Sequence, residues 1–190
     1  MVLGISGGIP LTISWTIIGA TLMKPITELM KSYAHYHRDR RNKATHFIGV
    51  PVIVYALFLL LSIGQLAGTE QSPVPVTAAT VGFGICMMYY LRLDVGLAVL
   101  QLPFSALPLY LANYTANLVP AAEALWIFLI TFVSGWAIQF VGHYFEGKKP
   151  ALFDNIMQVF NAPLFLAMEL AFAFGWRNDL RQAVDAEPTI

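Results

Sequence analysis

The sequence predicts an all-α polytopic membrane protein, a single integral membrane domain over residues 1–190 with five or six transmembrane helices. Of its 190 residues, 57% are hydrophobic and only 12% are charged, whereas soluble domains carry about 25% charged residues. The mean hydropathy is +0.65. The 11 basic and 11 acidic side chains are too few to cover the surface of a soluble chain of this length.

The candidate spans are apolar runs of about 20 residues, the length that crosses a hydrocarbon layer about 30 Å thick. In chain order they are Val2–Met23, Ile48–Gly68, Pro73–Leu91, Leu93–Ala112, Ala124–Val141 and Ile156–Trp176. The first is uncharged but contains several glycines and a proline, so we treat residues 1–23 as a possible extra N-terminal helix. It lacks the basic start of a signal peptide.

The remaining spans differ in the polar residues that interrupt them. Ile48–Gly68 and Ala124–Val141 contain no charge, whereas Leu93–Ala112 is interrupted by an acid and two prolines. Ile156–Trp176 holds a single acid, Glu169. An acid within hydrocarbon is costly, so Glu169 is expected to have a partner or a function.

Two polar loops, Lys24–Thr45 and Gly142–Asn155, carry basic residues, and the positive-inside rule places both on the cytoplasmic side. Four predicted spans separate them, an even number that returns the chain to the same side. Six spans in total would put the polar tail, residues 177–190, outside. Alternatively, Ile156–Trp176 is re-entrant around Pro163.

The charge balance and the cysteine content exclude several classes. Equal numbers of acidic and basic residues leave no electrostatic footprint for nucleic acid, so we expect no such partner. A single cysteine, Cys86, excludes an internal disulfide framework and a cysteine-cluster metal site.

All four histidines lie in or directly beside the two loops on the predicted cytoplasmic side: His35, His37, His46 and His143. A site dominated by imidazoles suits Zn, Fe, Cu or Ni. The alternative is that the histidines are independent of one another at the membrane interface. We expect a metal or proton-transfer site where the two loops meet.

Spacing leaves two pairings of the histidines open. On one unbroken helix His35, Asp39, Asn42 and His46 share a face. His37 would then point away from His46, so these two can bind one metal only if the chain bends between them. Asn42 is a plausible N-cap at such a bend.

Carboxylates near the histidines could join the metal shell. Glu146 follows His143 by three residues, so both lie on one helix face, with Glu146 as a ligand or as the group that orients the imidazole. Asp39 and Glu169 are further candidates. The sequence contains no HExxH motif, which argues against an intramembrane zinc protease.

Three stretches resemble the family of small membrane 2-hydroxy fatty acid dioxygenases, in the same order. They are YHRDRRNKATH (residues 36–46), QFVGH (139–143) leading into EGKKPALFDN (146–155), and APLFLAME (162–169). The resemblance covers about Tyr33–Gly175. The family pattern departs from this chain at Arg38 and Arg40.

The resemblance implies an Fe(II)-dependent dioxygenase that uses O2 to shorten a 2-hydroxy fatty acid by one carbon. It implies that His37, His46 and His143 hold the Fe(II), and it favours the bent loop because His35 has no counterpart in the family. Other motif positions are Asn42, Gln139, Glu146, Asp154, Asn155 and Glu169. Of these, we assign Asn42 and Glu146 to the catalytic site.

We expect an integral membrane location, the bacterial inner membrane or the endoplasmic reticulum of a eukaryote, with the metal site on the cytoplasmic side. The acyl chain would lie between helices, and membrane lipid would surround them. Lys148, Lys149 or Arg41 could attract the carboxylate, although basic residues at this level more often meet anionic lipid.

Two other classes remain as alternatives: a non-catalytic membrane scaffold, or a small transporter with a structural histidine or metal site. A scaffold would leave the histidines independent. A transporter needs polar residues that line the middle of several spans, and we count only Asp94, Gln101 and Glu169 as such.

Overall fold

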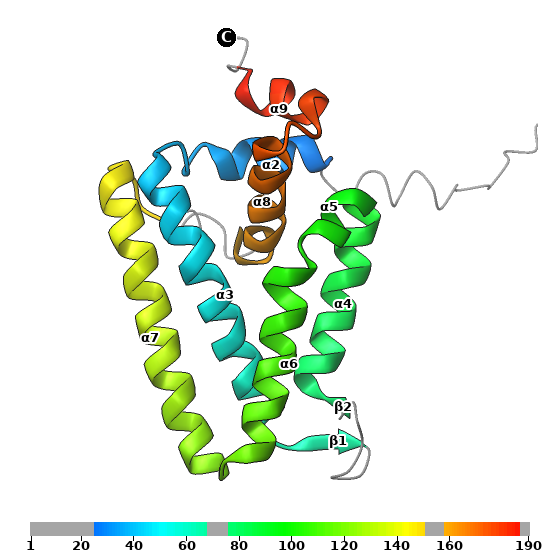
Figure 1. Cartoon of the computed structure of the whole chain (residues 1–190), viewed down its shortest axis with the longest axis vertical. Helices are drawn as coiled ribbons and strands as arrows, with labels where there is room; N and C mark the ends of the chain where they lie inside the picture. The colour runs from blue at the N-terminus through cyan, green and yellow to red at the C-terminus, as the bar shows by residue number, and fades with distance from the viewer. Residues whose placement is uncertain (1–24, 68–75, 151–157, 187–190) are drawn as a thin grey trace, which may run out of the picture.

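The computed structural model describes residues 25–67, 76–150 and 158–186 (Figure 1). Its elements are α2 (Ile26–Ala34), α3 (Arg40–Ser62), β1 (Gln65–Ala67), β2 (Val76–Thr77), α4 (Ala78–Leu93), α5 (Val95–Leu100), α6 (Leu102–Leu118), α7 (Ala121–Glu146), α8 (Gln158–Ala173) and α9 (Asn178–Asp185). The all-α class is confirmed. The predicted helix at Val2–Met23 lies outside the described residues, as do Asp154 and Asn155.

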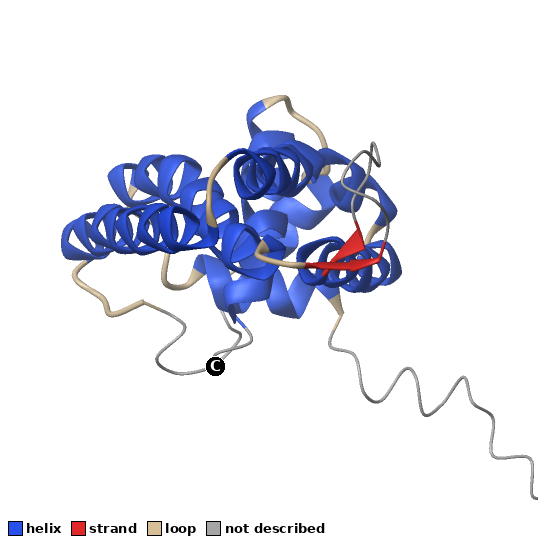
Figure 2. Ribbon diagram, turned by 90° about the horizontal axis from the view of Figure 1, so that it is seen from below, coloured by secondary structure: helices blue, strands red, loops and turns tan. Residues whose placement is uncertain are grey.

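The long helices run side by side and are covered at one end (Figure 1). There α2 lies across the bundle next to the start of α3, and α9 packs against α2; we call this the α2/α9 end. At the opposite end β1 and β2 form a small antiparallel pair. Viewed from that end, the two strands sit at one edge of the helices (Figure 2).

Two described helices, α3 and α7, are long and apolar enough to cross a membrane. A third span is reached only if α8 and α9, which meet at 112°, count as one broken span or re-entrant segment. The prediction of five or six spans is therefore not confirmed within the described part of the chain.

The spans predicted between residues 73 and 112 fall short because their helices are interrupted. Helix α4 is apolar but has only 16 residues. It ends where the Asp94 carboxylate accepts a hydrogen bond from the Leu97 amide and so caps α5. The chain then starts a separate helix, α6, with Pro103 in its first turn. The predicted span Leu93–Ala112 is thus divided between α5 and α6.

Helix α8 is apolar because protein surrounds it. Each residue of Leu164–Met168 is 0% exposed, and α8 contacts α2, α3, α5 and α6. The chain turns after Ala173 and not around Pro163, which lies inside the helix. By contrast, Trp126 and Ile130 on α7 are more than 60% exposed, as expected for side chains that face lipid.

Helices α3 and α7 run antiparallel and pack closely near the α2/α9 end. A Cβ atom placed on Gly142 of α7 would lie 2.0 Å from Oγ1 of Thr45 and 3.2 Å from the Cα of Asn42, both on α3. Only glycine fits at this position, so the contact fixes how near the two helices approach.

Candidate metal centre

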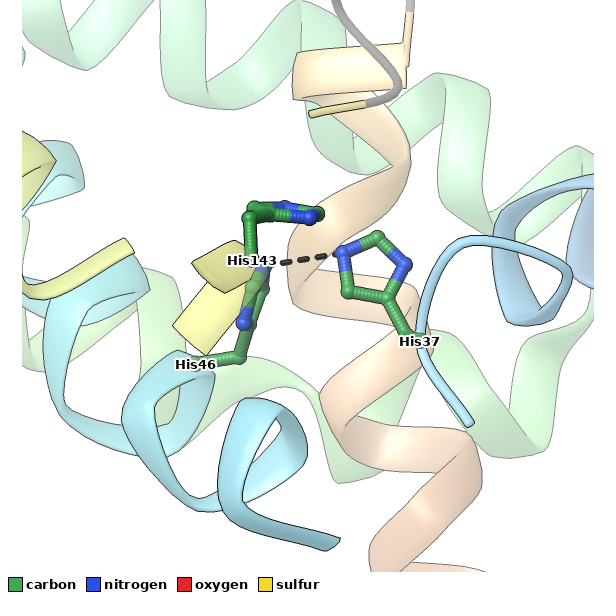
Figure 3. A group of neighbouring side chains, drawn as sticks. All are labelled: His37, His46 and His143. Carbon is green, nitrogen blue, oxygen red and sulfur yellow. Dashed lines mark hydrogen bonds between the residues drawn. The ribbon is translucent and has the colours of Figure 1, made fainter. Parts of the chain in front are cut away.

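Three histidines from distant parts of the chain converge near the α2/α9 end (Figure 3). His37 lies in the loop between α2 and α3, His46 lies in the second turn of α3, and His143 lies near the end of α7. They are 1%, 3% and 5% exposed. One ring nitrogen from each lies within 4.8 Å of those from the other two. The sequence predicted a metal or proton-transfer site where the two loops meet, and the structure brings together three histidines there that could hold a metal ion.

Hydrogen bonds fix the tautomers of two of these rings. Nδ1 of His37 lies 2.7 Å from the carbonyl oxygen of Tyr33, and Nδ1 of His46 lies 2.8 Å from that of Asn42. Carbonyl oxygens only accept hydrogen bonds, so each Nδ1 carries the hydrogen. Both Nε2 atoms therefore present lone pairs, and they face each other at 2.9 Å.

This donor set fits a cation. Two lone pairs at 2.9 Å repel unless a positive charge lies between them, and Nδ1 of His143 is buried with no hydrogen-bond partner among the described residues. Burial beside His46 lowers the pKa of His37 to about 2, so this ring is neutral, as a ligand must be. Three neutral imidazoles without a thiolate suit a divalent transition metal such as Fe(II) or Zn(II).

The bend that brings His37 to His46 lies before Asn42. Asp39 is the N-cap of α3, and its carboxylate accepts a hydrogen bond from the amide of Arg41. The prediction of Asn42 as the N-cap was wrong because Asp39 caps the helix and leaves Asn42 in its first turns. The straight-helix pairing is excluded, since His35 lies outside the cluster and is exposed.

Glu146 holds the bent loop against the end of α7. Its carboxylate accepts hydrogen bonds from the backbone amides of Arg38 (3.0 Å) and Asp39 (2.7 Å), and from Nδ2 of Asn42 (3.1 Å). Nδ2 of Asn42 also donates to the carbonyl oxygen of Tyr36. Because Glu146 follows His143 by three residues, one carboxylate ties the loop of His37 to the helix of His143.

The other candidate carboxylates have cationic partners. Asp39 pairs with Arg41 at 2.8 Å, and hydrogen bonds from Arg41 lower the pKa of this carboxyl to about 2. Glu169 pairs with Lys43 at 2.6 Å. Among the described residues, neither belongs to the group that could hold a metal.

A mainly apolar cavity, partly open to the surroundings, extends from the histidines. Its apolar lining comes mainly from α3 and includes Val50, Ile53, Val54 and Leu57. Its polar lining includes Tyr33, Gln139 and Gln158 beside the three histidines. On the other side of His37, a polar cleft is lined by Arg38, Arg40, Lys43 and Arg181.

Sequence reasoning missed the part that Tyr33 plays. Its ring stacks on His37, with centroids 4.3 Å apart, and its carbonyl oxygen sets the tautomer of that histidine. The spacing of four residues between Tyr33 and His37 was an available signal.

Of the basic residues expected to attract a substrate carboxylate, Arg41 pairs with Asp39, and Lys148 donates a hydrogen bond to the carbonyl oxygen of His35.

Comparisons with known proteins identify a family for this chain. The family model described as "2-hydroxy-palmitic acid dioxygenase Mpo1-like" matches residues 23–174, a range that contains all three histidines. The chain is similar to the 2-hydroxy-palmitic acid dioxygenase MPO1 of Saccharomyces cerevisiae, with 33% identity over 159 residues, 80% of this chain and 83% of the yeast protein. No solved structure matches the chain.

Proposed function

The chain belongs to the Mpo1-like family, and we propose that it is an Fe(II)-dependent membrane dioxygenase that shortens 2-hydroxy fatty acids by one carbon. One O2 balances the conversion of the hydroxy acid to a fatty acid one carbon shorter, CO2 and water. The observation that carries the proposal is the buried group of His37, His46 and His143 at the head of an apolar cavity.

In this proposal the three histidines hold the iron and the cavity holds the acyl chain. Fe(II), when bound, supplies the oxygen chemistry that cleaves the bond between carbons 1 and 2. The hydroxy acid offers carboxylate and hydroxyl oxygens at one end and a purely apolar chain at the other. That polarity matches a cavity with imidazoles at one end and the aliphatic side chains of Val50, Ile53 and Leu57 along its wall.

Asn42 and Glu146 act, in this proposal, as positioning residues for His37. Their hydrogen bonds go to each other and to the loop backbone, so they keep His37 opposite His46. A ligand held in position before the metal arrives loses less conformational freedom on binding, which favours tight binding.

We further propose that the α2/α9 end faces the cytoplasm. The basic residues Arg38, Arg40, Arg41 and Lys43 gather there, on the loop and first turn that carry the site. This is the charge distribution that the positive-inside rule associates with the cytoplasmic face. The hydroxy acid would reach the cavity from the surrounding lipid.

The test is anaerobic reconstitution of the purified protein with Fe(II), followed by addition of 2-hydroxypalmitic acid and O2. We expect a fifteen-carbon fatty acid by mass spectrometry and about one iron per chain. Each of H37A, H46A and H143A should lose both iron and product. A variant that keeps full iron would remove that histidine from the ligand set, and wild-type protein with full iron but no shortened product would refute the enzyme.

A further inference from the structure

One buried polar group in the cavity has no role in holding the metal or the loop. Gln139 is 4% exposed, lines the cavity beside the histidines, and its Oε1 has no hydrogen-bond partner among the described residues. A buried acceptor without a partner has lost its hydrogen bonds to water and gained none in return. A donor that enters the cavity would recover this loss.

The position of Gln139 relative to the metal centre follows from helix geometry. It precedes His143 by four residues on α7, so both lie on one face, and it is about 6 Å further from the α2/α9 end. On α3, Gly49 follows His46 by three residues and faces Gln139. A Cβ atom at Gly49 would lie 2.8 Å from Nε2 of Gln139, so the amide rests directly on the glycine backbone. The amide is thereby fixed on the apolar side of the histidines.

The second glutamine of the cavity is already satisfied. Gln158 accepts a hydrogen bond from Nδ2 of Asn161 and donates one to Oγ of Ser32, both at 3.2 Å. The two glutamines therefore differ in the property that matters for a ligand: only Gln139 offers a free amide oxygen. Gln158 provides a matched control.

We propose that Gln139 recognises the 2-hydroxyl group of the substrate, with the hydroxyl donating a hydrogen bond to Oε1. The inference rests on the proposed function, since a hydroxy acid held at the three histidines places carbon 2 beside them and the chain beyond it along the cavity. A fatty acid without the hydroxyl leaves Oε1 unpaired and binds more weakly. Because the acceptor comes from the α7 side alone, it also distinguishes the two enantiomers of the hydroxy acid.

The test measures equilibrium binding to anaerobic, Fe(II)-loaded protein in lipid nanodiscs, where turnover cannot occur without O2. Radiolabelled 2-hydroxypalmitic acid is displaced by each of its enantiomers and by palmitic acid. We expect Q139M to reduce the preference for the hydroxy acid over palmitic acid by about tenfold, the loss of roughly one hydrogen bond. The enantiomer preference should fall with it, while iron content stays at the wild-type level.

The control Q158M should leave both preferences unchanged. If iron-loaded Q139M kept the wild-type preferences for the hydroxy acid and for one enantiomer, the proposed role of Gln139 would be overturned. The proposed function would still stand in that case, provided that the wild-type protein shortens 2-hydroxypalmitic acid. Wild-type protein that neither binds nor shortens any 2-hydroxy acid would overturn both. Should Q139M fail to fold, Q139N keeps an amide but withdraws its oxygen, and the same loss of both preferences is expected.

Discussion

The two ends of the α3–α7 pair are held together by different kinds of contact. Far from the metal centre, Leu59 of α3 and Ala124 of α7 pack in an apolar cluster with Ala112 of α6. Near the metal centre, the contact is made by Gly142 and by the hydrogen bonds of Glu146. Apolar contacts are non-directional and tolerate small shifts. By contrast, the close approach of α3 to Gly142 and the hydrogen bonds of the Glu146 carboxylate each hold the two helices at one distance and orientation. The first kind maintains the pair, and the second kind sets the distances between imidazoles.

Among changes that leave the three histidines in place, the largest effect on metal retention is expected from G142A. The added Cβ would lie 2.0 Å from Oγ1 of Thr45, so α3 and α7 must separate and carry His46 and His143 apart. We expect iron affinity to fall by about 100-fold, the upper range for overpacking a close contact. Chelator competition measures this. G82A is the control, because no atom lies within 4 Å of a Cβ at that site, and equal iron affinity in both variants would contradict the prediction.

A smaller loss is expected from E146Q. Glutamine keeps the shape but has one acceptor oxygen and no charge, so the amides of Arg38 and Asp39 lose charge-assisted hydrogen bonds. Iron affinity should fall by about tenfold, as for other residues that orient metal ligands. The matched control is E123Q, at the exposed start of the same helix. Loss of activity without any change in iron affinity would instead indicate that Glu146 acts on the substrate.

The smallest effect on the metal is expected from L59A, although it should destabilise the fold. Leu59 is 0% exposed, and leucine-to-alanine changes at such sites cost about 2–5 kcal/mol. The thermal unfolding midpoint should therefore fall while iron affinity stays at the wild-type value. Parallel losses of both would show that the two ends of the helix pair are not independent.

Composition was sufficient to predict the helical class, and the positions of the imidazoles predicted a site where the two loops meet. Spacing left the pairing of the histidines open, and only the resemblance to the dioxygenase family selected His37, His46 and His143. The sequence was not sufficient to predict the contacts of Glu146, since the amides of Arg38 and Asp39 are backbone groups that every residue type but proline carries. Nor does an apolar run such as Ile156–Trp176 reveal whether protein or lipid will surround it. The predicted number of spans was too high partly because protein, and not lipid, surrounds α8. It was also too high because Asp94 caps a separate short helix, whereas we expected one interrupted helix over Leu93–Ala112.

The order in which the ligands occur along the chain has a consequence for biosynthesis. His37 and His46 leave the ribosome early, whereas His143 is made only after α4, α5 and α6. Until α7 packs beside α3, the nascent protein has only the imidazoles of His37 and His46, and the imidazole of His143 is missing from the site. A metal that needs all three imidazoles can therefore bind only when the polypeptide is nearly finished, and truncated copies released before that stage would not hold it tightly.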